Sequence, residues 1–139
     1  MAALRFFLQI LLSLILLVVV IDADGSSIAD FIDEHINSKE VLIFSKTRCP
    51  YCVAAKHLLN RINKKKEYIV TVVEIDEKPQ EQQTIYMDEL YRRTNQRTVP
   101  NIFIGGKHVG GNDHVQALYR QGELEKMLKE LRVDYGEEL

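Results

Sequence analysis

The sequence has 139 residues but only two cysteines, no tryptophan and three prolines. Two thiols are too few for a zinc site built from four cysteines. The chain contains no internal repeat and no low-complexity tract. Its formal net charge is −2, and its one basic run, Lys64-Lys65-Lys66, suits the solvated end of a helix. No nucleic-acid-binding surface is therefore expected, and the size and mixed charge indicate one globular domain.

Charge is nearly absent from the N-terminal part of the chain, where Arg5 is the only charged residue before Asp22. As a helix, the apolar run of residues 6–21 would extend about 24 Å at about 1.5 Å per residue. This length is shorter than the hydrocarbon core of a membrane, which is about 30 Å thick. Residues 1–24 are therefore predicted to be a secretory signal peptide or an uncleaved signal anchor, with membrane anchoring through residues 6–21 left open. The domain, residues 25–139, is expected in the lumen of the endoplasmic reticulum or Golgi, or outside the cell if the signal is cleaved.

Apolar periodicity and turn residues outline the elements of the domain. The first half is expected to contain a helix capped by Ser26 or Ser27, a buried strand over 41–44, a helix from Cys49-Pro50 to the lysines and a strand over 69–75. A helix over 80–94 should follow, and then two strands over 101–104 and 107–109 joined by Gly105-Gly106. The chain should end with a helix capped by Asn112 or Asp113 and a last helix over 124–131. Strand, helix and strand in close succession predict a parallel βαβ unit, followed by an antiparallel hairpin. The fold class is therefore α/β, with one central sheet and helices on both faces.

Cys49 and Cys52 are separated by two residues and lie between the first strand and the next helix. A disulfide closing so short a loop would stabilise the fold by only about 2 kcal/mol before strain. A zinc site would need His108 and His114 as well, but about 55 residues separate Cys52 from His108, far more than in a zinc finger. A Cys-X-X-Cys pair inside a βαβ unit is typical of a redox-active dithiol.

The predicted surroundings of Cys49 favour its thiolate. The residue lies at a helix N-terminus, where backbone N–H groups are unpaired and the helix dipole is positive. Lys46 and Arg48 add positive charge nearby. Pro50 suits the first helical turn. Cys52 lies one turn further on the same face, where it can attack a mixed disulfide formed on Cys49.

With Cys49-Pro50-Tyr51-Cys52 interpreted in this way, the chain from about residue 26 to 133 resembles a dithiol glutaredoxin. Three more segments resemble family motifs in family order and spacing: Phe44-Ser45-Lys46-Thr47, Arg97-Thr98-Val99-Pro100 and Gly110-Gly111-Asn112-Asp113. A thioredoxin would instead carry Trp-Cys-Gly-Pro-Cys. The resemblance implies a thioredoxin fold with a central mixed four-stranded sheet flanked by helices. It also implies a monomer with glutathione as co-substrate and no metal.

The resemblance also implies roles for individual residues. Cys49 would be the nucleophile, and Cys49 and Cys52 would form the redox-active disulfide. The residues expected to bind glutathione are Lys46, Tyr51, Gln83, Arg97, Thr98, Val99, Pro100, Gly111, Asn112 and Asp113.

Within that set, Arg97 would approach the glycine carboxylate of glutathione. Val99, before an expected cis Pro100, would offer its backbone to the cysteinyl part. Asn112 and Asp113 would hold the γ-glutamyl end. Lys46 and Tyr51 would line the groove.

One residue departs from the family pattern. Met87 stands where many members have a glutamine that reaches the glycine carboxylate, and methionine cannot donate that hydrogen bond. Gln83, one turn earlier, is the candidate to replace it.

The implied activity is the reduction of protein–glutathione mixed disulfides and small disulfides through Cys49. The expected partners are thus glutathione, glutathionylated proteins and disulfide substrates. Two alternatives remain open. One is a module that binds an iron–sulfur cluster through Cys49 and glutathione, against which Pro50 argues. The other is a redox sensor tethered to a membrane through residues 6–21.

Overall fold

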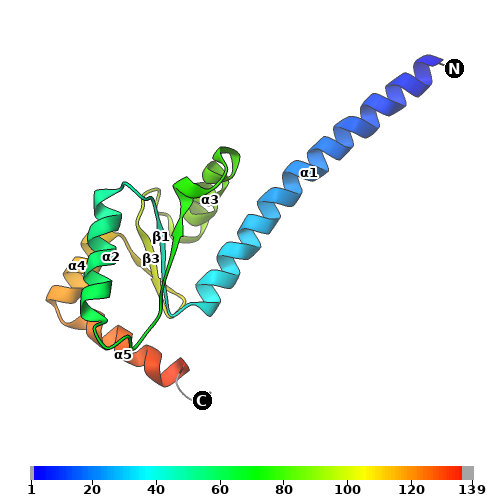
Figure 1. The fold of residues 1–139 in the computed structure, drawn as a ribbon. Coiled ribbons are helices and arrows are strands. Elements are labelled where there is room, and N and C mark those ends of the chain that lie inside the picture. Colours follow the sequence, from blue (N-terminus) through cyan, green and yellow to red (C-terminus); the bar gives the residue numbers. More distant parts are fainter. Residues whose placement is uncertain (1, 136–139) are drawn as a thin grey trace.

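The computed structural model describes the backbone of residues 2–135 and the side chains of residues 4–15 and 27–131. Its elements are α1 (Ala2–Ser38), β1 (Val41–Ser45), α2 (Pro50–Ile62), β2 (Val70–Glu74), the short 3-10 helix η1 (Ile75–Glu77), α3 (Gln80–Thr94), β3 (Asn101–Ile104), β4 (Lys107–Gly110), α4 (Asn112–Arg120) and α5 (Glu123–Tyr135). Figure 1 shows the strands between layers of helices, which confirms the predicted α/β class.

The four strands form one mixed sheet in the order β2-β1-β3-β4. β1 pairs in parallel with β2 and antiparallel with β3, and β3 pairs antiparallel with β4. Phe44, near the end of β1, lies opposite Asn101 at the start of β3. The chain leaving β1 and the chain entering β3 therefore meet at the same edge of the sheet, which is where the cysteine pair follows.

Alternate residues of β1 pack into two separate layers, as side chains on a strand must. Val41 and Ile43 pack with buried residues of α2, α4 and α5. Leu42 and Phe44 pack with buried residues of α1 and α3. All five residues of β1 are buried, as expected for a strand inside the sheet with helices on both faces.

The Gly105-Gly106 turn between β3 and β4 confirms the predicted hairpin. Both glycines have positive φ, +54° and +75°. A two-residue turn with two positive φ values matches the twist of the flanking strands, and glycine adopts it without steric cost.

The predicted start of the first helix at Ser26 or Ser27 is wrong. α1 is continuous from Ala2 through these serines to Ser38. No proline lies in this stretch. A glycine in a helix interior costs about 1 kcal/mol relative to alanine and serine less, so neither Gly25 nor the serines end the helix.

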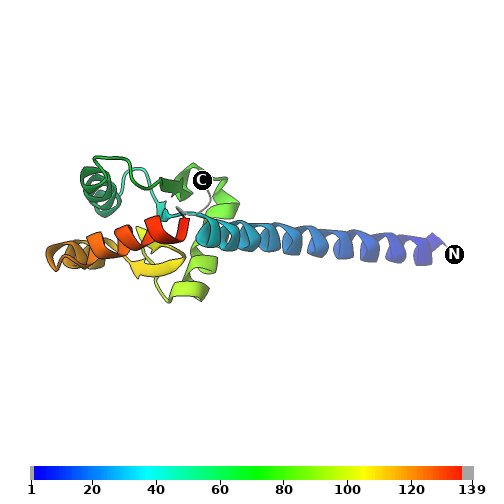
Figure 2. The ribbon, with the colours of Figure 1, turned by 90° about the horizontal axis from the view of Figure 1, so that it is seen from below.

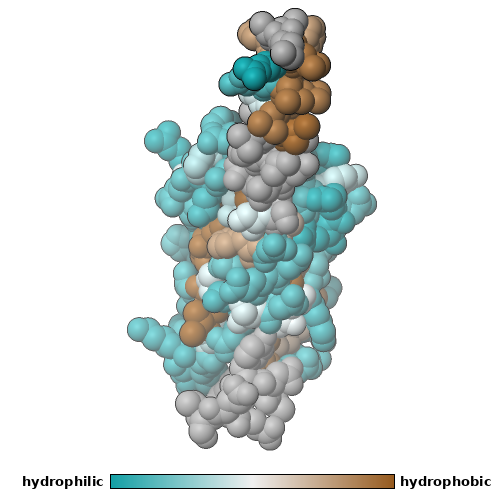
Figure 3. Space-filling view, turned by 90° about the vertical axis from the view of Figure 1, so that its right-hand side faces the viewer, coloured by the Kyte–Doolittle hydropathy of each residue, from teal (hydrophilic) through white to brown (hydrophobic). Residues whose placement is uncertain are grey.

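The N-terminal part of α1 projects away from the sheet and the other helices (Figures 1 and 2). Its large apolar side chains between residues 4 and 15 are 43–74% exposed. Figure 3 shows this part as a hydrophobic surface next to a mostly hydrophilic domain. The predicted signal or anchor, residues 1–24, lies partly outside the described side chains. Within the described residues, no helix has the length and apolarity needed to cross a membrane.

Candidate active site

The two cysteines lie at the start of α2, one accessible and one buried. Cys49 is the N-cap residue, and Pro50 follows as the first residue of the helix. The Cys49 N–H donates to the Lys46 carbonyl at 3.2 Å, so the incoming loop turns tightly before the helix. Cys49 is partly exposed, Cys52 is fully buried, and both are free thiols. Only Cys49 can therefore meet a substrate directly.

The surroundings shift the pKa values of the two thiols in opposite directions. Burial raises the pKa of Cys49, but this effect is outweighed by hydrogen bonds from the Cys52 thiol and from the N–H groups of Cys52 and Tyr51, together with the charge of Lys46. The net pKa of Cys49 is lowered. Burial raises the pKa of Cys52, where the neighbouring Cys49 adds to the effect. Cys49 is thus the thiol of the pair that ionises more readily.

A loop before β3 faces the accessible thiol. The Val99-Pro100 peptide bond is cis, as predicted. The Cys49 Sγ lies 3.8 Å from the Val99 carbonyl oxygen. Gln96, a residue that sequence reasoning missed, donates from Nε2 to the carbonyls of Thr98 and Pro100, each at 2.8 Å. One side chain therefore holds both sides of the cis bond in place.

A cavity of about 410 Å³ opens beside this loop. Its lining residues are Tyr51, Gln96, Thr98, Val99, Pro100, Gly111, Asn112, Asp113 and His114. The volume lies in the range of about 300–1,000 Å³ that is usual for small-molecule sites. The structure thus brings together, in one place, predicted residues from three distant segments. Gln96 and His114 are additional, and of these His114 had been considered only as a zinc ligand.

The start of α4 offers backbone N–H groups to this cavity. The prediction that Asn112 or Asp113 caps the helix is wrong, because Gly111 is the N-cap and no side chain caps it. The Asn112 side chain instead accepts a hydrogen bond from Gln116 Nε2 at 3.3 Å. An uncapped helix start attracts an anion. Asp113 adds a carboxylate beside it, so this end of the cavity suits a group that carries both a carboxylate and an ammonium.

Three predicted residues, Arg97, Gln83 and Lys46, lie outside the cavity lining. The Arg97 guanidinium lies over the Tyr91 ring, 3.7 Å from its centroid. Gln83 donates from Nε2 to the Lys78 carbonyl at 2.9 Å. Neither side chain contributes to the cavity in this conformation.

Lys46 and Met87 have different surroundings again. Lys46 is close enough to Cys49 to lower its pKa, although it does not line the cavity. Met87 is partly buried and packs against the apolar cluster that contains Phe44 and Leu90. Its side chain is therefore used in packing.

Asp76 anchors the loop before the cysteines and was also missed from the sequence. Both of its carboxylate oxygens accept the Thr47 N–H at 3.0 Å, and one accepts the Thr47 hydroxyl at 2.6 Å. The hydrogen bond from the Thr47 hydroxyl is the main cause that lowers the pKa of Asp76. β1 and β2 pair in parallel with Ser45 opposite Glu74, so the segments that follow the two strands lie side by side. The contact between Thr47 and Asp76 therefore follows from the sheet register.

The two histidines that a zinc site would need, His108 and His114, interact electrostatically with each other. Burial lowers the pKa of His108, and the charge of His114 adds to the effect. Within the described residues, no cluster of three or more histidine, cysteine, aspartate or glutamate side chains is placed to hold a metal ion.

Comparison with known proteins gives concordant matches. The model of the glutaredoxin family matches residues 41–109. A glutaredoxin of Ricinus communis is 44% identical over 97 residues, which are 70% of this chain and 89% of the relative. Glutaredoxin-C2 of Arabidopsis thaliana is 43% identical over 97 residues, 70% of this chain and 82% of the relative.

Solved structures agree in the fold. A buckwheat glutaredoxin–glutathione complex superposes with a TM-score of 0.71 at 34% identity, over 78% of this chain and 94% of that one. Glutaredoxin C1 from Populus tremula x tremuloides, in its holo form, gives a TM-score of 0.68 at 34% identity, over 76% and 98% of the two chains. These likenesses confirm the predicted thioredoxin fold.

Proposed function

This chain belongs to the glutaredoxin family of glutathione-dependent thiol–disulfide oxidoreductases, and we propose that it reduces protein–glutathione mixed disulfides and small disulfides through Cys49. One observation carries the proposal. An accessible thiol with a lowered pKa and a buried thiol with a raised pKa lie one helical turn apart, next to a cavity that suits a zwitterion.

The first step is an attack of the Cys49 thiolate on the glutathione sulfur of the mixed disulfide. A new S–S bond joins Cys49 to glutathione, the protein–glutathione S–S bond breaks, and the protein thiolate leaves and takes up a proton. The thiolate of a second glutathione then attacks the glutathione sulfur on Cys49. This step forms oxidised glutathione and returns Cys49 to its thiolate.

A second route uses Cys52. Its thiolate attacks the Cys49 sulfur of a mixed disulfide, which forms the internal Cys49–Cys52 disulfide and releases the other thiol. Two glutathione molecules then reduce this disulfide. The raised pKa of Cys52 makes this route slower near neutral pH, because only the thiolate attacks.

We assign the cavity to the glutathione moiety. The α-carboxylate of its γ-glutamyl end would meet the N–H groups at the start of α4, and its ammonium would meet Asp113. The backbone of Val99 would pair with the cysteinyl part, with Lys46 and Tyr51 beside the sulfur. Arg97 would have to leave the Tyr91 ring to reach the glycine carboxylate.

Two serine variants test the assignment. With a small glutathione mixed disulfide as substrate, Cys49→Ser should lose about 1,000-fold or more in kcat/KM, because no nucleophile remains. Cys52→Ser should keep most of the activity, because glutathione itself resolves the intermediate. Full activity in Cys49→Ser would refute the proposed function.

We also propose that residues 1–24 direct the chain into the secretory pathway, as a cleaved signal or as an anchor. The exposed apolar side chains between residues 4 and 15 and the nearly uncharged sequence support this role. N-terminal sequencing of protein isolated from membranes and from lumenal fractions would distinguish the two forms. A cytosolic protein with an intact N-terminus would contradict both.

A further inference from the structure

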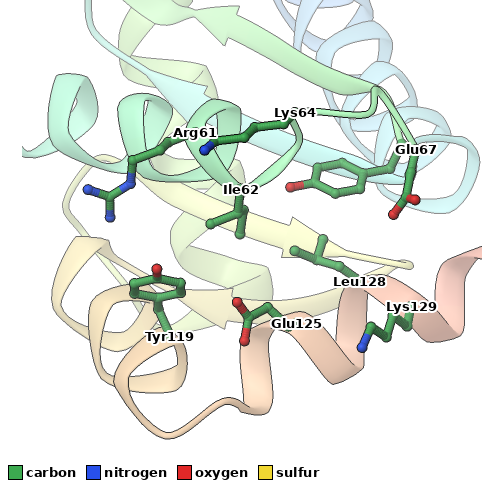
Figure 4. A pocket seen from close by; sticks show the side chains of 9 residues that line it. Arg61, Ile62, Lys64, Glu67, Tyr119, Glu125, Leu128 and Lys129 are labelled. Atoms are coloured by element: carbon green, nitrogen blue, oxygen red, sulfur yellow. The ribbon is translucent and has the colours of Figure 1, made fainter.

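A second cavity lies at the end of α2 opposite to the thiols. Provided that the chain acts on glutathionylated proteins as proposed above, we propose that this cavity binds an acidic segment of the protein substrate. Its volume is about 490 Å³, and its lining residues are Arg61, Ile62, Lys64, Glu67, Tyr68, Tyr119, Glu125, Leu128 and Lys129. Figure 4 shows α2 and the following loop on one side of it and Tyr119 with α5 on the other.

The inner wall of the cavity is apolar. Leu128 and Tyr68 are buried members of the core, and Ile62 packs against them. The Tyr68 hydroxyl donates to the Leu59 carbonyl at 2.9 Å, so it is not available as a donor to a ligand. Burial raises the pKa of Tyr68 to about 12, so the ring carries no charge. This wall therefore suits an apolar side chain.

The rim of the cavity is cationic. Arg61, Lys64 and Lys129 are exposed, and an adjoining hollow adds Lys65. Across the side chains that the structure describes, no ion pair includes any of these cations.

The two cavities together are lined by four cations and two carboxylates, although the chain as a whole has a net charge of −2. The guanidinium of Arg61 lies 5.6 Å from the centroid of the Tyr119 ring, which holds it at the cavity mouth. The rim therefore favours a ligand that carries several negative charges.

The same two helices connect this cavity to the thiol site. Tyr51 and Asn112, at the starts of α2 and α4, line the first cavity. Ile62 and Tyr119, at or near the ends of those helices, line the second. α2 packs against α4, so the two cavities lie along one pair of helices.

The distance between the thiol site and the second cavity sets how long a peptide segment must be to reach both. From Tyr51 to Ile62 the helix rises about 17 Å at about 1.5 Å per residue. About five residues of extended chain cover that distance. A protein segment with its glutathionylated cysteine at Cys49 can therefore place residues about five positions away in the second cavity.

A peptide segment fits both parts of the cavity better than a free anion does. Phosphate would engage only the cations and would leave the apolar wall uncovered. Two acidic side chains on either side of a leucine would pair with the rim and cover the wall at the same time.

The test compares three substrates: a glutathionylated peptide with Glu-Leu-Glu about five residues from its cysteine, the same peptide with Lys-Leu-Lys, and a small glutathione mixed disulfide. The variant is Lys64→Glu with Lys129→Glu in the full chain. The matched control, Lys78→Glu with Lys107→Glu, makes the same charge change away from the cavity. Turnover of the small disulfide reports whether each variant is folded.

We expect the cavity variant to lose about tenfold in kcat/KM for the acidic peptide and to gain for the basic peptide. Its kcat/KM for the small disulfide should stay within about twofold of the unmodified protein, and the control should resemble that protein with all three substrates. If the unmodified protein has the same kcat/KM for both peptides, the inference is overturned while the proposed function stays intact. The same holds if the control variant loses as much kcat/KM for the acidic peptide as the cavity variant does. Failure of the unmodified protein to turn over the small disulfide would refute the proposed function, and the inference with it.

Discussion

Cys49 and Cys52 have the same chemistry but different surroundings, and the difference comes from a single turn of helix. Cys49, at the N-cap, receives hydrogen bonds from Cys52 and from the N–H groups of the first turn. Cys52 is buried behind it, where a charge has poor solvation. At the scale of the residue, position in α2 therefore decides which of the two cysteines has the lower pKa. Lys46 adds a cation close to Cys49.

The first residue-scale prediction concerns the pH dependence of alkylation. A lowered pKa means that half of Cys49 is thiolate at a pH below the ordinary cysteine pKa. Iodoacetamide should therefore label Cys49 with a midpoint below that value, while Cys52 stays unlabelled in the folded protein. In Lys46→Gln the midpoint should rise, because a cation that favours the thiolate is lost.

The measurement is the rate of labelling at each cysteine, followed by mass spectrometry across a pH series. Lys107→Gln, at an exposed position at the start of β4, is the control and should leave the midpoint unchanged. A midpoint at or above the ordinary cysteine pKa in the unmodified protein would contradict an activated thiol.

Site residues differ in how far they were predictable from the sequence. Thr98, Val99 and Asp113 stand inside recognisable motifs, and the structure places them at the same cavity. Gln96 and Asp76 act on backbone groups of loops, and the partner of Asp76 lies 29 positions away in the chain. The contact of Asp76 depends on sheet register, which local sequence patterns do not specify, whereas the contacts of Gln96 reach only Thr98 and Pro100.

Arg97 shows the limit of a motif-based role. Asn95 ends α3 in a left-handed conformation, with φ at +56°. The chain then reverses, and Arg97 comes to lie over Tyr91 on the last turns of the same helix. A cation above an aromatic ring is stabilised without any ligand, so a charged residue in a family motif can have an internal partner.

At the scale of elements, the junction between β4 and α4 depends on a glycine. Gly110 has φ at +119°, a region that residues with a side chain rarely occupy. A Cβ atom there would lie 3.0 Å from His114 Nδ1, on a residue that lines the cavity. The direct passage from strand to helix therefore relies on the missing side chain.

Gly110→Ala should lower the free energy of unfolding by about 2–3 kcal/mol, the sum of backbone strain and a displaced His114. Gly122→Ala is the matched control: its φ is +73°, and nothing lies within 4 Å of the added Cβ. It should cost only about 1 kcal/mol, from the left-handed backbone alone. Urea unfolding would measure both values, and equal costs would show that the contact with His114 has no energetic effect.

Elements were predictable where their causes are local. The β3–β4 hairpin follows from two adjacent glycines, and α2 follows from Pro50 at its first position. The start of α1 did not follow from Ser26 and Ser27, because a capping residue is also tolerated inside a helix. The cap of α4 shifted to Gly111, because the Asn112 side chain bonds along its own helix.

At the scale of the whole molecule, α1 has two parts with different roles. Its C-terminal part belongs to the domain, since Ile28 and Ile32 are buried in the core. Arg93 on α3 fastens the same part: it pairs with Asp33 at 2.6 Å and donates to the Ala29 carbonyl at 3.2 Å. The described side chains of residues 4–15, by contrast, are all exposed.

Removal of residues 1–24 should therefore leave the fold and the thiol chemistry intact. We expect the melting temperature of the shortened chain to stay within about 2 °C of that of the full chain, and its kcat/KM for a small glutathione mixed disulfide within about twofold. Ile32→Ala in the full chain is the contrasting variant, because a large-to-small change in a packed core costs about 2–5 kcal/mol. A loss of that size would lower the melting temperature by about 10 °C or more.

Thermal unfolding followed by circular dichroism, with turnover measured on the same samples, would check both variants. The division of α1 predicts that stability is insensitive to the projecting part and sensitive to the packed one, because only the packed part removes apolar surface from water. If the shortened chain melts as low as Ile32→Ala does, the projecting part must contribute to the stability of the domain. The boundary of the folding unit would then lie before residue 25.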